Sequence, residues 1–302
     1  MRTTDAFSQI ERRRKLTRRA HCTTIGLNLS FRYSFDCIST SNVHMRVISF
    51  YTIDTPYEDE AKRLEKSLRR LGIEYAIAGL PSLGSWVANC AQKARFIRDE
   101  FNTNGGDFWW FDADAELAVQ PERFDPEKVD IAIALRHGWD PASGSCFFGT
   151  SNTTARLIDL WTEYCETYPF VWDQFLLGFA LHNMRIVEPI NVVQLSNAYI
   201  RKYKKGKITI FFKKLRELVG IRPAPIVRQY QASQRLKNAV LKVNPENPSN
   251  HIEIGDRSCP DHIRQVIAGR RSEPIDVGAV VEQMVKAEYG ISMQSQTSSW
   301  SD

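Results

Sequence analysis

Residues 107–117 read DFWWFDADAEL, an aromatic run that ends in acidic residues. Four consecutive aromatic side chains, Phe108 to Phe111, are too few for an ordinary helix and too apolar for a loop. They predict a short strand buried on both faces. Asp112 and Asp114 follow where the apolar run stops. Two carboxylates at this position can hold one divalent cation at the carboxyl edge of an open sheet.

The acidic pair also has plainer explanations. The chain contains 17 Asp among 302 residues, so chance alone supplies about one Asp-x-Asp. Asp also favours strand ends because its side chain bonds nearby backbone amides in turns. The metal site therefore depends on what surrounds the pair.

The residues before this stretch predict a strand, a helix and a second strand. Residues 46–52 form the first strand, and residues 73–78 form the second. Thr55 and Glu58 are typical of a capped helix start, and Gly72 is typical of a helix end. Because a helix joins the two strands, they form a right-handed parallel crossover. The predicted fold class is α/β, with a mainly parallel central sheet.

The turn after the first strand excludes two common classes of enzyme. Residues 52–56 read TIDTP and contain no glycine. Dinucleotide-binding folds and P-loop proteins bind phosphate through a glycine-rich loop at this place. The sequence therefore argues against a dehydrogenase or an ATPase.

A second helix is predicted after the Gly, Pro and Ser residues of segment 79–85. Its apolar stripe contains Val87, Cys90, Ala94, Ile97 and Phe101. Lys93 lies off that stripe, and the ordinary expectation for such a lysine is a solvated surface. The functional alternative is that Lys93 reaches a diphosphate.

Three more strands are predicted, at 129–135, 146–149 and 185–195. The Ser143-Gly144-Ser145 segment predicts a turn that leads into the second of them. Such a turn brings backbone close to a ligand or forms a tight hairpin, and both alternatives stay open.

Two more helices follow the same pattern. Ser151 or Asn152 is the expected cap of one, and Trp172, Asp173 and Gln174 open the other. Asp173 either caps this helix at its positive end or faces a ligand as a general base or acceptor-binding group.

Charge is segregated along the chain. Residues 1–45 carry a net charge of +5, residues 46–200 carry −8, and residues 201–302 carry +8. This asymmetry suggests separate modules, and a basic flank can meet phosphate, nucleic acid or anionic lipid.

The chain divides into four expected segments. Residues 1–44 are expected to be disordered or to precede a mis-assigned start at Met45, and residues 45–200 form the core. Residues 201–290 form a basic, helical and loop-rich C-terminal region, and residues 291–302 form a disordered tail.

The basic C-terminal region opens with an amphipathic helix. Residues 201–216 contain eight basic residues and no acid, and apolar residues recur at helical spacing through Val219. We expect the apolar stripe to pack on the protein's own domain. The alternative is peripheral contact of residues 201–219 with an anionic membrane. Residues 223–260 contain five prolines and predict loops.

The composition of the chain indicates the cellular compartment in which it is expected. The six cysteines contain no Cys-x-x-Cys pair, and no apolar run reaches the roughly 18 to 20 residues of a membrane span. We expect a reducing, cytoplasmic location, with attachment to the inner face of the membrane as the alternative.

Together these features resemble the GT-A class of glycosyltransferases, in the nucleotide-diphospho-sugar transferase superfamily. The resemblance covers roughly residues 46–200. It is carried by Phe50-Tyr51-Thr52, Gly84-Ser85-Trp86 with Lys93, Asp112-Ala113-Asp114, Ser143-Gly144-Ser145 and Trp172-Asp173-Gln174. It implies a Rossmann-related sandwich as the core.

The resemblance implies a metal site. In that class the Asp-x-Asp motif binds Mn²⁺ or Mg²⁺, and the ion grips the diphosphate of the sugar donor. Carried over, Asp114 would be a metal ligand and Asp112 would hold metal or ribose. His251 or His262 would add a third ligand, although neither lies in a motif that matches the class.

The resemblance also implies substrate contacts. Tyr51, Thr52 and Lys93 would bind the nucleotide donor, a UDP- or GDP-sugar. Asp173 would act on the acceptor, which could be a glycan, a lipid or a protein. The remaining expected substrate-binding residues are Ser143, Gly144, Ser145 and Gln174.

Two other functions remain in competition. An enzyme of Mg²⁺-dependent nucleotidyl or phosphoryl transfer would share the acidic pair. Such an enzyme usually also has a basic or glycine-rich phosphate-binding loop early in the chain. A non-enzymatic protein that binds membrane or nucleic acid through residues 201–216 would need no metal. We expect no specific nucleic acid partner.

Overall fold

A computed structural model describes residues 45–84, 86–203, 207–220, 224–230 and 259–289. The expectations for residues 1–44, for the tail at 291–302 and for His251 lie outside these residues. No helix in the described part of the chain is long and apolar enough to cross a membrane.

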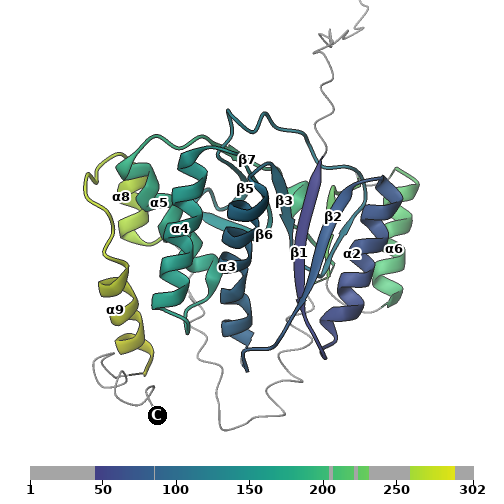
Figure 1. Cartoon of the computed structure of the whole chain (residues 1–302), viewed down its shortest axis with the longest axis horizontal. Coiled ribbons are helices and arrows are strands. Elements are labelled where there is room, and N and C mark those ends of the chain that lie inside the picture. The colour runs from purple at the N-terminus through teal and green to yellow at the C-terminus, as the bar shows by residue number, and fades with distance from the viewer. Residues whose placement is uncertain (1–44, 85, 204–206, 221–223, 231–258, 290–302) are drawn as a thin grey trace, which may run out of the picture. The chain divides into compact units, whose positions relative to one another are not determined.

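The centre of the fold is a six-stranded sheet, in the order β2-β1-β3-β6-β5-β7 (Figure 1). The β6 strand runs antiparallel to β3 and β5, whereas the other neighbours pair in parallel. The predicted α/β class with a mainly parallel sheet is therefore confirmed. The strands are β1 (Arg46–Thr52), β2 (Glu74–Leu80), β3 (Phe108–Phe111), β5 (Ile131–Arg136), β6 (Asp140–Phe148) and β7 (Val192–Gln194).

The aromatic strand β3 lies between two hydrophobic cores. Phe108 and Trp110 enter one core, whereas Trp109 and Phe111 enter the other, because successive side chains of a strand point to opposite faces. None of the four is more than 1% exposed. Trp109 is stacked between the rings of Phe111 and Tyr199, with centroids 5.4 and 5.2 Å away. The predicted burial on both faces is confirmed.

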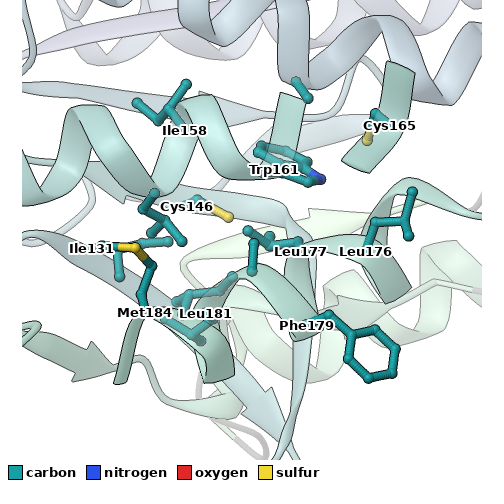
Figure 2. Packing of buried hydrophobic residues seen from close by; sticks show 14 of the residues in the cluster. Ile131, Cys146, Ile158, Trp161, Cys165, Leu176, Leu177, Phe179, Leu181 and Met184 are labelled. Carbon is teal, nitrogen blue, oxygen red and sulfur yellow. The ribbon is translucent and has the colours of Figure 1, made fainter. Parts of the chain in front are cut away.

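Helices cover one face of the sheet. Figure 2 shows Trp161 of α4 near Leu177 of α5 and Cys146 of β6, within the core that these helices form. Figure 1 shows α8 and α9 beyond α5 at one side of the view, and α6 at the other side. The helices of this face are α3 (Trp86–Asn104), α4 (Asn152–Thr167), α5 (Asp173–Val187), α8 (Asp261–Ile267) and α9 (Val277–Tyr289).

The other face carries α2 (Tyr57–Leu71) and a second sheet of short strands, in the order β4-β9-β8. These strands are β4 (Ala115–Leu117), β9 (Val227–Gln229) and β8 (Arg201–Lys202). The β9 strand lies in the segment 223–260, which was predicted to be rich in loops, and the strand itself was not predicted. A three-residue strand whose partner lies more than a hundred residues away leaves no periodic pattern in the sequence.

The α6 helix (Lys207–Leu218) was predicted, but most of its described apolar side chains do not pack on the domain as expected. The large exposed side chains of this segment are Phe211, Phe212, Leu215, Leu218 and Val219. Glu217 is buried instead. The helix is therefore oriented by polar contacts rather than by its apolar stripe.

Local signals placed some boundaries correctly and others wrongly. Gly72 ends α2 with φ of 65°, as predicted for a left-handed helix cap. The predicted cap is wrong by one residue, because Pro56 rather than Thr55 is the N-cap and the Glu58 carboxylate accepts from the Asp54 amide. The expected strand at 185–195 is wrong in its first part, since α5 continues through Val187 before β7 forms the sheet edge.

The predicted turn at Ser143–Ser145 is also wrong. These residues lie inside β6, and the chain reverses earlier, at His137 and Gly138. His137 and Gly138 have positive φ, 53° and 79°, in the three-residue turn between Arg136 and Asp140. Such values suit a tight hairpin. The hairpin alternative for Ser143–Ser145 is therefore wrong, because the hairpin lies in the segment that was predicted as a loop.

His182 lies in the buried part of α5. Its Nε2 lies 3.1 Å from the carbonyl oxygen of Trp139, and a neutral ring donates this hydrogen bond. Burial lowers the pKa of His182 to about 4, although the bond to Trp139 acts in the opposite direction. Arg185 lowers the pKa further.

We expect the free energy of unfolding to fall as the pH drops from 6.5 to about 4. In this window the unfolded chain protonates His182 while the folded chain does not, so acid favours unfolding. The pKa difference corresponds to roughly 3 kcal/mol. Urea titrations across this window should show a weaker pH dependence for His182→Gln. An identical dependence in both proteins would contradict the assignment.

Candidate functional site

The site lies where the order of the sheet changes direction. From β1 the chain passes through α2 to β2 on one side, whereas β3 pairs with the other side of β1. Ligands of open α/β sheets bind outside the carboxyl ends of the strands at such a switch point. Thr52 ends β1 and Asp112 follows β3, so both stand at this edge.

The Asp-x-Asp segment forms the turn between β3 and β4. The Asp112 amide donates to the Gly144 carbonyl at 3.1 Å, and the Asp114 carbonyl accepts from the Tyr230 amide at 3.1 Å. The Asp112 side chain is 36% exposed. It accepts a hydrogen bond from the Trp110 indole at 3.1 Å, which fixes its direction. The carboxylate is thus oriented and open to a ligand.

Lys93 lies at the centre of the site rather than on the surface where a lysine off the apolar stripe was expected. Its ammonium is 3.0 Å from Asp112 Oδ1 and 3.1 Å from Asp173 Oδ2, and it donates to Ser143 Oγ at 3.2 Å. The side chain is only 8% exposed. Lysine is almost never buried unless it is paired. Here two carboxylates from different elements supply the pairing.

The charges of this cluster shift its ionisation. Burial lowers the pKa of Lys93, but Asp112 and Asp173 more than offset this and hold the pKa well above its ordinary value. Burial raises the pKa of Asp173, against the opposing effect of Lys93, and the Asp112 carboxylate raises it further. Lys93 is therefore a fixed positive charge.

Asp173 does not cap the α5 helix. Trp172 occupies the cap position and its side chain makes no capping bond, whereas Asp173 begins the helix itself. Ser143 Oγ donates to Asp173 Oδ2 at 3.3 Å. Among the described residues, the buried Oδ1 atom of Asp173 has no hydrogen-bond partner. A buried carboxylate oxygen without a protein partner is costly, so it calls for a water, an ion or a catalytic role.

Gly144 allows the backbone of β6 to lie against Asp112. A Cβ atom at this position would lie 2.8 Å from Asp112 Oδ2 and 2.7 Å from Gln229 Nε2. The β5–β6 pairing is irregular between Ile133 and Leu135. At this irregularity the side chains of Ser143 and Ser145, which the sequence had placed in one turn, point to different partners.

The two serines reach different partners. Ser143 Oγ bonds Lys93 and Asp173, whereas Ser145 Oγ donates to the Tyr199 carbonyl at 3.1 Å. A bulged strand re-aims side chains that a regular strand would keep on one face. Of this pair, Ser143 therefore belongs to the Lys93 cluster and Ser145 does not.

The other expected substrate residues lie at the end of β1 and at the start of α5. The Tyr51 ring lies across Gly79 of β2, and Thr52 is buried at the end of β1. Gln174 is directed away from the cluster, because its Nε2 donates to Asp140 Oδ1 at 3.1 Å. Their roles toward a substrate stay predictions.

The sequence had not assigned Tyr57 to the site, but this side chain lies close enough to the acidic pair to sense its charge. Tyr57 had been expected to pack only as part of the apolar stripe of α2. Its pKa is raised mainly by burial, and the charges of Cys90, Asp114 and Asp112 raise it further. It bonds Trp86, whose ring is 6.3 Å from that of Trp172. The neighbouring Gly84-Ser85-Trp86 and Trp172-Asp173 motifs were the only sequence signal.

Carboxylate oxygens are the ligands that a hard cation prefers, and substrate phosphates can supply the remaining ligands. No group of three or more His, Cys, Asp or Glu residues capable of holding a metal is found among the described residues. His262, on α8, therefore does not complete a set with Asp112 and Asp114. Mg²⁺ is commonly bound by one or two carboxylates plus substrate phosphates and water, so a metal site at Asp112 and Asp114 stays a prediction.

The chain was also compared with known proteins. No family model matches it, and no curated protein matches it in sequence. It is similar to the solved structure of a glycosyltransferase involved in the glycosylation of the major capsid of PBCV-1. The TM-score is 0.46 at 10% identity, covering 64% of this chain and 97% of that chain.

Two structures of the glycosyltransferase GlyE from Streptococcus pneumoniae TIGR4 are also similar. The apo form has a TM-score of 0.37 at 15% identity, covering 62% of this chain and 54% of that chain. The second has a TM-score of 0.37 at 12% identity, covering 82% and 84%. Because these similarities are low, the function proposed below rests on the geometry of the site.

Removing the Lys93 ammonium should destabilise the fold. In Lys93→Met, Asp173 would stay buried without its counter-charge, at a cost of roughly 3 to 5 kcal/mol in the free energy of unfolding. Urea denaturation measures this loss. The double variant Lys93→Met/Asp173→Asn should recover part of it, because the uncompensated charge is gone. Additive losses in the double variant would contradict a direct pairing.

Proposed function

We propose that this protein is a metal-dependent glycosyltransferase that moves a sugar from a nucleotide-diphosphate sugar to an acceptor. The observation that carries the proposal is the Lys93 bridge, which joins Asp112 at the end of β3 to Asp173 at the start of α5. Under this proposal the partly exposed Asp112 carboxylate would serve the donor, and the buried Asp173 carboxylate would serve the acceptor. Sugar transfer requires both sides at one place.

On the donor side, Asp112 and Asp114 would hold Mn²⁺ or Mg²⁺. The ion would neutralise the charge that develops on the leaving nucleoside diphosphate. Trp110 and Lys93 orient the Asp112 carboxylate, and the backbone of Gly144 packs against it. Tyr51 and Thr52, at the end of β1, would line the pocket of a UDP- or GDP-sugar.

On the acceptor side, Asp173 would take the proton of the attacking hydroxyl, as an inverting mechanism requires. Burial raises its pKa toward the working pH, which strengthens it as a general base. Its Oδ2 atom is held by Lys93 and Ser143, which leaves Oδ1 to accept the proton. The acceptor would be a glycan, a lipid or a protein.

Phosphoryl or nucleotidyl transfer is the second candidate, because it shares the two aspartates. It is less well supported, since the loop after β1 contains no glycine and no basic residue. The buried Asp173 also has no evident use in a reaction that needs only metal and phosphate positioning.

The four described cysteines, Cys90, Cys146, Cys165 and Cys259, are free thiols. Free thiols fit a reducing compartment, so we place the protein in the cytoplasm. Peripheral contact with the inner face of the membrane is a separate proposal, which rests on the α6 helix.

Asp114→Ala should abolish metal-dependent turnover. Hydrolysis and transfer from a panel of UDP- and GDP-sugars with Mn²⁺ should fall at least ~100-fold, because the ion loses a ligand. Asp159→Ala, which removes an exposed carboxylate on α4, is the matched control and should keep full activity. Absence of sugar-nucleotide binding and of turnover in the unaltered protein would refute the proposal.

Asp173→Asn should lower kcat far more than it raises KM for the donor. The amide keeps the size of the side chain but cannot take a proton, so a loss of ~100-fold or more in kcat is expected. Steady-state kinetics with a competent acceptor measure both constants. Unchanged kcat would exclude Asp173 as the base and favour a mechanism without one.

A further inference from the structure

The α6 helix is attached to the protein through its polar side. Ile210, Lys213, Lys214 and Glu217 follow the spacing of one helical face, and they are the less exposed side chains within residues 210–218 of the helix. Three of these four side chains are charged. An ordinary surface helix places its apolar face inward, so the orientation of α6 is inverted.

Ion pairs hold this orientation. Lys214 Nζ lies 2.9 Å from Glu116 Oε2, and Glu217 Oε2 lies 2.9 Å from Arg228 Nη2. Tyr203 also donates a hydrogen bond to Glu217. The Glu217 side chain is only 2% exposed. Rotating the helix to bury its apolar face would leave this buried charge without partners, which is costly.

The outward face is therefore apolar. Phe211 is 61% exposed, Phe212 is 57% exposed and Leu218 is 84% exposed. The two phenylalanine rings contact each other at a centroid distance of 5.8 Å. Leu215 and Val219 extend the same exposed set along the helix. Contiguous apolar surface of this kind marks an interaction site.

The basic residues of this segment favour an anionic partner. Residues 201–216 contain eight basic residues and no acid, in contrast to the net charge of −8 across residues 46–200. Arg216 is exposed on α6 beside the apolar residues. A second copy of the chain would bring an equally basic rim against this one, which like charges oppose. An anionic lipid surface attracts the rim and accepts the apolar side chains.

We propose that α6 docks on an anionic membrane surface, with Phe211, Phe212 and Leu218 entering the boundary between headgroups and acyl chains. The helix lies flat, and the ion pairs of Lys214 with Glu116 and of Glu217 with Arg228 keep it fixed to the protein. Arg216, which is exposed beside the apolar side chains, meets the lipid phosphates.

Vesicle flotation tests the proposal. The full chain should bind vesicles of phosphatidylcholine with phosphatidylglycerol, bind phosphatidylcholine alone much more weakly, and lose binding at high salt. Phe211→Ser/Phe212→Ser/Leu218→Ser should reduce binding at least ~10-fold. The matched control, Val119→Ser/Val187→Ser/Ile267→Ser, removes exposed apolar side chains elsewhere and should bind as the unaltered chain does.

Several results would overturn the proposal. Absence of binding to anionic vesicles, or equal binding by the α6 variant, would exclude a membrane contact through this face. A lower unfolding midpoint of the α6 variant without lipid would mean that another part of the chain covers these side chains. A change from dimer to monomer in size-exclusion chromatography would assign the face to a second copy.

Discussion

The buried ammonium of Lys93 joins three parts of the fold that are far apart in sequence. It comes from α3, and its partners belong to the end of β3, to β6 and to the start of α5. A lysine in this position is stable only while both carboxylates are present, and Asp173 is stable in its buried place only while the lysine is present. The packing of α3 and α5 on the sheet is thus tied to the geometry of the site. Any change that separates the two helices also separates the charges.

The aromatic strand β3 fixes where this cluster can form. Its four side chains fill both cores, so the strand can shift neither along its axis nor across the sheet without opening a void. Asp112 follows the last aromatic residue directly, and its direction is set by the indole of Trp110 from the same strand. Rigid placement of this kind is what a binding carboxylate requires. The same residues therefore serve the core and the site.

The sequence was most informative where structure depends on neighbours along the chain. The bounds of β1, the glycine cap at Gly72 and the burial of β3 follow from local patterns, and the structure has them as predicted. Lys93 was expected on the surface because its partners are assembled by the fold and cannot be seen from helical spacing. The polar attachment of α6 depends in the same way on Glu116 and Arg228. The Ser143–Ser145 segment has the composition of a turn, yet its glycine is needed inside a strand because Asp112 lies against it.

The reversed direction of β6 makes the site depend on a hairpin some distance from it. The turn at His137 and Gly138 sets the register in which β6 returns beside β3 and β5. A single inserted or deleted residue in that turn would move Ser143 or Ser145 into the place of Gly144. Either side chain would then occupy the space of the Asp112 carboxylate. Although surface hairpins commonly tolerate changes of length, this one is constrained to a fixed number of residues.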